Sequence, residues 1–124
     1  MNAVLWIVAV VLALAFIGAG MMKLTQPKEK LAVSGMAWTE GFSPATIRLI
    51  GTLEVLAALA LVLPALLDTA TDLVPWAAVG LVLLMLGAAA THLRRKEPQM
   101  VAVNFGLIVL ALVVAWGRFS AEPF

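Results

Sequence analysis

The sequence contains no cysteine and only one histidine among its 124 residues. The absence of cysteine excludes disulfide bonds, thiolate nucleophiles and cysteine-ligated metals, and it leaves the redox compartment unspecified. A single histidine argues against an intrinsic metal site. Charge is also scarce, because Asp, Glu, Lys and Arg make up 12% of the chain, against roughly a quarter in soluble domains. With a formal net charge of +1 and no basic face, the sequence gives no support for nucleic-acid binding.

Hydrophobic residues, in contrast, account for 64% of the positions, which predicts an integral membrane protein. An apolar run of about 20 residues rises roughly 30 Å as a helix, the thickness of the hydrocarbon core. We therefore expect an all-α fold, a four-helix bundle in the membrane that forms a single domain over residues 1–124. The expected spans lie at about residues 3–23, 44–64, 73–92 and 98–117.

Local signals mark the span boundaries. Ser43 before Pro44 predicts a capped helix start, and Asp72 is a cap candidate for the third span. In the long first connection, Pro27 and Gly35 suggest a short helix begun by proline and stopped by glycine. We expect this helix to be interfacial. Its apolar residues Leu31, Met36 and Trp38 would hold it against the membrane surface, and the other tryptophans would anchor span ends.

Basic residues are unevenly distributed between the two ends of the expected bundle. Arg118 is the one basic residue at the end that holds the termini. The first and third loops, with the start of the second span, hold Lys23, Lys28, Lys30, Arg48, Arg94, Arg95 and Lys96. The positive-inside rule therefore predicts an inner-membrane protein with the first and third loops in the cytoplasm and both termini outside.

Glu54 interrupts the apolar stretch at residues 49–67 and is expected about 15 Å deep in the membrane. A carboxylate at the centre of a membrane helix costs about 2.5 to 3.5 kcal/mol on insertion scales, so it needs a partner or a proton. Gly51, Ala57 and Ala58 share its helical face, and small residues allow membrane helices to approach closely. We expect Glu54 to face the bundle interior.

Other polar residues are expected in the same half of the bundle. Lys23, His92 and Asn104 lie on three other spans, so they are the candidate partners of Glu54. Each of these spans has a stripe of small residues for close helix packing, which includes Gly20 beside Lys23 on the first span and Gly80 and Gly87 on the third. Arg48 precedes Glu54 by six residues, about 240° around the helix, so Arg48 and Thr91 are only secondary candidates. An alternative is that these groups merely satisfy one another as polar contacts between helices. Lys23 alone is typical of a snorkelling interfacial residue.

Three short motifs resemble the DoxX-like family of small four-span membrane proteins. They are GAGMMKL at residues 18–24, IGTLEVL at 50–56 and GAAATHLRR at 87–95. The resemblance extends over nearly the whole chain and implies a compact four-helix membrane protein. The family name derives from a thiosulfate:quinone oxidoreductase subunit, while most relatives have no settled activity. Some related proteins carry cysteine pairs suited to electron transfer; this chain has none, so a redox role would be auxiliary or quinone-based.

The leading hypothesis is a polar cavity lined by Lys23, Glu54, His92 and Asn104 that binds a small amphiphile, with a quinone as the possible cofactor. The protein would then serve a membrane redox or stress-response system, with a redox partner or a second copy beside it in the bilayer. No catalytic residue is assigned, and an autonomous enzyme is not expected. One alternative is a proton-coupled small-molecule transporter that uses Glu54. Another is a non-catalytic assembly subunit that contacts its partner through a lipid-facing patch and the first loop.

Overall fold

The computed structural model describes residues 2–33 and 35–124 and contains no strand within them. The four long helices in this part of the chain are α1 (Asn2–Thr25), α3 (Pro44–Leu66), α4 (Leu73–Arg94) and α5 (Pro98–Trp116). Each is long and apolar enough to cross a membrane. The expected all-α membrane bundle is therefore confirmed. The helices end within two residues of the expected spans, and α5 continues as a π-helical turn, η2 (Gly117–Ala121).

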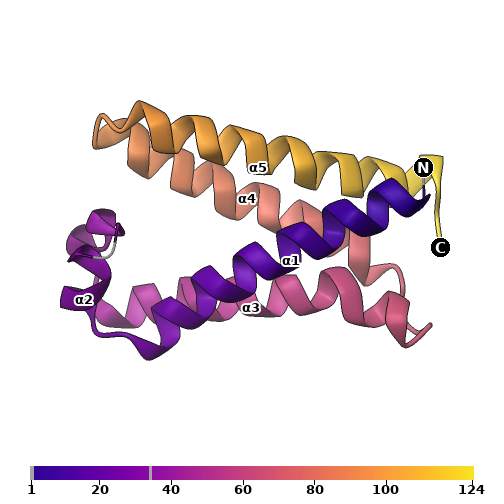
Figure 1. Ribbon diagram of the computed structural model, residues 1–124, viewed down its shortest axis with the longest axis horizontal. Coiled ribbons are helices and arrows are strands. Elements are labelled where there is room, and N and C mark those ends of the chain that lie inside the picture. The colour runs from indigo at the N-terminus through magenta and orange to yellow at the C-terminus, as the bar shows by residue number, and fades with distance from the viewer. Residues whose placement is uncertain (1, 34) are drawn as a thin grey trace.

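The long helices pack as two main pairs, α1 with α3 and α4 with α5. The N-terminal and C-terminal ends of the chain lie at the same end of the bundle, where α1 is close to α5 (Figure 1). Toward the other end, α1 leans away from α5 and follows α3. The first loop lies at that end, so the bundle is closed near the termini and splayed beside the loop (Figure 1).

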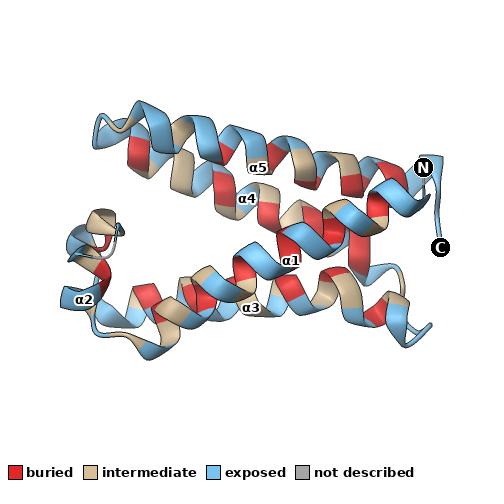
Figure 2. Cartoon of the chain, viewed as in Figure 1, coloured by how far each residue is buried: buried red, intermediate tan, exposed pale blue. Residues whose placement is uncertain are grey.

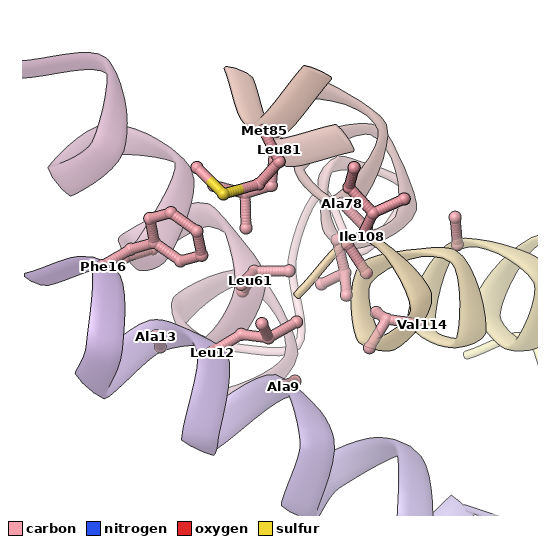
Figure 3. Packing of buried hydrophobic residues seen from close by; sticks show 14 residues of the cluster. Ala9, Leu12, Ala13, Phe16, Leu61, Ala78, Leu81, Met85, Ile108 and Val114 are labelled. Carbon is pink, nitrogen blue, oxygen red and sulfur yellow. The ribbon is translucent and has the colours of Figure 1, made fainter. Parts of the chain in front are cut away.

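The hydrophobic core occupies the inner faces of the four long helices (Figures 2 and 3). Leu12, Leu61, Leu81 and Val114, one from each helix, are at most 1% exposed. The outer faces are also apolar, and Leu14 is 68% exposed. Such an extensive apolar exterior is unsuited to water but matches a lipid environment. The protein is therefore a multi-pass membrane protein.

Two of the expected helix boundaries have a visible cause in the structure. The Ser43 hydroxyl accepts a hydrogen bond from the Thr46 N–H at 3.2 Å, and Pro44 occupies the first turn of α3. The short helix α2 (Lys28–Val33) is followed by Gly35 at φ +95°, a left-handed conformation that favours glycine. Asp72, in contrast, precedes α4 without making the expected side-chain cap.

The first loop packs against the protein more closely than the sequence analysis predicted. Leu31 on α2 is completely buried by protein atoms rather than resting on the membrane surface. A second short helix, the 3-10 helix η1 (Ala37–Gly41), follows α2. Thr39 within it is also fully buried, and its hydroxyl donates to the Met36 carbonyl oxygen at 2.7 Å. The loop therefore forms a folded cover at the splayed end of the bundle.

Candidate ligand-binding site

The site begins with a close contact between the backbones of α1 and α3. A Cβ atom added to Gly20 would lie 2.8 Å from the carbonyl oxygen of Gly51, and one added to Gly51 would lie 2.9 Å from that of Gly20. Neither position has room for a side chain, so the two glycines let the helices cross in direct contact. Lys23 and Glu54 each follow one of these glycines by three residues. The crossing therefore brings their side chains together.

Lys23 and Glu54 form a buried ion pair. The distance from Lys23 Nζ to Glu54 Oε1 is 2.7 Å, and the side chains are only 6% and 3% exposed. Each charge compensates the other in a medium of low dielectric, where an unpaired charge is very costly. Lys23 is thus the counter-ion of Glu54. Arg48, by comparison, is exposed on α3, in agreement with its position about 240° away from Glu54.

A cavity of about 630 Å³ lies beside the ion pair. Its walls come from all the long helices and from the segment at residues 35–42. The polar lining residues are Lys23, Glu54, Thr91, His92, Arg94 and Asn104. Most of the remaining wall is apolar, including Phe16, Ile50, Leu84 and Leu107. This volume, and an apolar wall with a few polar groups, are typical of small-molecule sites.

Asn104 on α5 supplies a further buried polar group. It is 6% exposed, and its Nδ2 donates to the Met85 sulfur at 3.4 Å. Its Oδ1 has no hydrogen-bond partner among the described residues. An unsatisfied buried acceptor costs about 1 to 3 kcal/mol. Asn104 is also one of the residues that line the cavity.

His92 lines the cavity but is engaged by a partner other than Glu54. Its Nδ1 lies 2.8 Å from Glu97 Oε1, and Arg95 Nε lies 3.3 Å from the same oxygen. The hydrogen bond to His92 lowers the pKa of the Glu97 carboxyl, and the charge of Arg95 lowers it further. His92 is therefore held toward the turn between α4 and α5. Glu97 was not predicted as a partner of His92, although it follows His92 by only five residues.

Trp38 is the main wall residue that the sequence analysis assigned differently. Its ring centroid lies 5.5 Å from Lys23 Nζ, within reach of a cation–π contact. Phe42 packs edge-on against it with ring centroids 5.6 Å apart. Both rings line the cavity, together with Met36. The position of Trp38 near a span end is typical of an interfacial anchor. Its ring faces the cavity because of the fold of the first loop, which the sequence did not predict.

The small residues on α4 also differ from expectation. Gly80 and Gly87 were expected on a helix-packing face, yet no described atom lies within 4 Å of a Cβ built on either one. Gly87 lines the cavity, because α4 separates from α1 at the splayed end. The glycines Gly80 and Gly87 on α4 therefore lie beside open space, whereas Gly20 and Gly51 lie at a close contact between two helices.

The cavity combines charged, amide and aromatic groups. Among the described residues there is no group of three or more His, Cys, Asp or Glu that could hold a metal ion. The cavity offers a cationic donor at Lys23, a carboxylate at Glu54, an amide at Asn104 and an aromatic wall at Trp38. The rest of the lining is largely apolar. This arrangement suits a molecule with one polar end.

Comparison with known proteins agrees with the architecture. No curated protein and no solved structure matches the chain. The model of the DoxX-like family matches residues 7–115, which include the α1–α3 crossing, the ion pair and the cavity walls on α4 and α5. This match covers most of the sequence, so the chain belongs to the DoxX-like family.

Proposed function

We propose that this protein binds the polar head of a small amphiphile, such as a quinone, as an auxiliary component of a membrane redox or stress-response system. The observation that carries the proposal is the Lys23–Glu54 pair at the wall of a largely apolar cavity. Buried ion pairs are weak evidence for stability, since apolar replacements are often at least as stable. The position of this ion pair beside a cavity is therefore better explained by a ligand that enters the cavity than by stability.

The polar groups suit a head that both accepts and donates hydrogen bonds. The Lys23 ammonium carries donors for a carbonyl oxygen, as a quinone provides. The Oδ1 of Asn104 accepts from a hydroxyl, as a quinol provides, and it has no competing donor among the described residues. Trp38 adds a flat apolar surface for a ring. A quinone or quinol ring therefore carries the kinds of oxygen that Lys23 and Asn104 can bind.

Ligand-dependent thermal stability tests this function. We expect benzoquinones and related amphiphiles to raise the Tm of the wild-type protein in lipid nanodiscs, because a ligand that binds only the folded state stabilises it. Glu54→Gln should lose most of this rise, because the carboxylate that holds Lys23 Nζ in place beside the cavity is then absent. The compared quantity is the change in Tm on ligand addition, so a lower starting Tm of the variant does not affect the result.

Arg48→Gln is the matched control, because it also neutralises a charge on α3 but lies on the exposed face of that helix. It should keep the full ligand-induced rise in Tm. Equal rises in wild type and Glu54→Gln would contradict specific binding at the ion pair.

Proton-coupled transport is the second candidate, and it depends on the same carboxylate. A membrane glutamate that exchanges a proton for a cation must release its counter-charge during each cycle. Glu54 already has a tethered counter-ion in Lys23, with both side chains buried, which favours binding over cation exchange. Substrate uptake driven by a pH gradient in reconstituted vesicles, lost in Glu54→Gln, would favour transport instead.

A further inference from the structure

A second hollow lies on the lipid-facing side, between α3 and α4. It is an apolar groove of about 590 Å³ with walls formed by residues 53–60 of α3 and 73–84 of α4. None of its lining residues is charged. Leu56, Leu73 and Trp76 are more than half exposed along it. The groove is thus open toward the region that the bilayer occupies.

The groove is continuous in its lining with the cavity beside the ion pair. Leu83 and Leu84 line both hollows. On the facing helix, Leu53 lines the groove and the adjacent Glu54 lines the cavity. The two hollows therefore share a wall at one level of the bundle. The apolar tail of a molecule with its head beside Glu54 would reach the groove past these two leucines.

Small residues give the groove its depth. Ala57 and Ala60 on α3 lie opposite Ala77 and Gly80 on α4. No described atom lies within 4 Å of a Cβ built on Gly80. Along α4, the distance from Leu73 to Leu84 is about 16 Å, at 1.5 Å per residue. The groove is therefore long enough for an extended hydrocarbon chain.

We propose that this groove holds the hydrocarbon tail of the same molecule whose head occupies the cavity. This inference rests on the proposed function and defines its ligand class as a single-tailed amphiphile with a compact, uncharged head. The head is uncharged because the buried charges beside it, Lys23 and Glu54, already neutralise each other, whereas Arg94, the other cation of the lining, is exposed. The tail follows from the shared lining at Leu83 and Leu84.

Chain-length dependence of binding provides the test. Equilibrium affinities of butyl-, octyl- and dodecyl-benzoquinone are measured in nanodiscs and expressed relative to ligand dissolved in the bilayer, so that partitioning cancels. We expect wild-type affinity to rise about tenfold from butyl to dodecyl, equivalent to about 1.4 kcal/mol. Gly80→Leu fills the groove and should bind butyl-benzoquinone like wild type while losing the rise. Ala60→Leu fills it from the opposite wall and should behave in the same way.

Gly106→Leu is the matched control. Gly106 also lies within a long helix, no described atom approaches its Cβ position within 4 Å, and it lies outside both hollows. It should keep the tenfold rise. A groove variant that keeps the rise, or that changes only the oligomeric state, overturns the tail assignment while leaving the head site intact. If wild type binds none of the benzoquinones, the proposed function fails and the tail assignment falls with it.

Discussion

At the residue scale, Glu54 shows how far one position in the sequence informs the structure. Its cost in an apolar span indicated an interior position and a partner, and helical spacing separated Arg48 from the other cations. The structure pairs Glu54 with Lys23 and turns His92 toward Glu97. His92 lies at the end of α4, where a short turn brings a local carboxylate within reach. Sequence spacing cannot rank such a local partner against a distant one without the turn geometry.

Breaking the ion pair should be more damaging than removing it. Lys23→Met or Glu54→Gln leaves the remaining partner buried and uncompensated, which costs about 3 to 5 kcal/mol. The double variant has no buried charge, so we expect it to recover much of the loss. The measurement is a double-mutant cycle of unfolding free energies in one detergent or lipid system. Additive single effects would show that the two side chains do not act as a pair.

At the element scale, the crossing of α1 and α3 was anticipated from small residues, and the first loop was only partly anticipated. Gly20 lies on the same helical face as Lys23, and Gly51 lies on the same face as Glu54. Helical periodicity allows such faces to be recognised in the sequence. The loop has no period, so the inward position of Trp38 did not follow from its sequence. Gly80 and Gly87 were wrongly predicted to lie at a helix contact. The sequence alone does not distinguish a glycine against which a neighbouring helix packs from a glycine beside an open volume.

Gly51→Ala tests the crossing. Its added methyl group would meet the Gly20 carbonyl oxygen and the Lys23 Cβ, each at 2.9 Å, so the helices must move apart. We expect a loss of about 1 to 3 kcal/mol in unfolding free energy, the usual effect of overpacking. Gly106→Ala has open space and should be neutral or slightly stabilising. Similar unfolding free energies for the two variants would mean that the crossing tolerates separation.

At the scale of the whole molecule, four apolar runs predicted the fold and the converging polar residues predicted a cavity, whereas the size of the cavity and its apolar wall could not be predicted. Its volume depends on the splay of α1 away from α5 and on the cover formed by the first loop. Both are consequences of packing that appear in no single segment. Composition alone still predicts on which side the splayed end lies, because the basic residues of the first and third loops are at that end.

The sidedness is testable on a clean background, because the chain has no native cysteine. We expect Lys96→Cys, in the third loop, to react with a membrane-impermeant maleimide only after the inner membrane is permeabilised, which gives the reagent access to the cytoplasmic face. Ser120→Cys, near the C-terminal end, should react without opening the inner membrane, once the reagent can reach the outer face of that membrane. If Ser120→Cys needs permeabilisation and Lys96→Cys does not, the splayed end of the bundle lies on the outer side.

The central claim is that a ligand occupies the cavity beside Lys23 and Glu54, and Trp38 reports on it directly. The measurement uses a variant that keeps Trp38 and carries Phe in place of Trp6, Trp76 and Trp116. Its fluorescence is titrated with dodecyl-benzoquinone in nanodiscs, where a bound quinone quenches the adjacent indole. We predict saturable quenching that Glu54→Gln removes. Quenching that rises without saturation, equally in both proteins, would identify a quinone merely dissolved in the bilayer and would contradict the site.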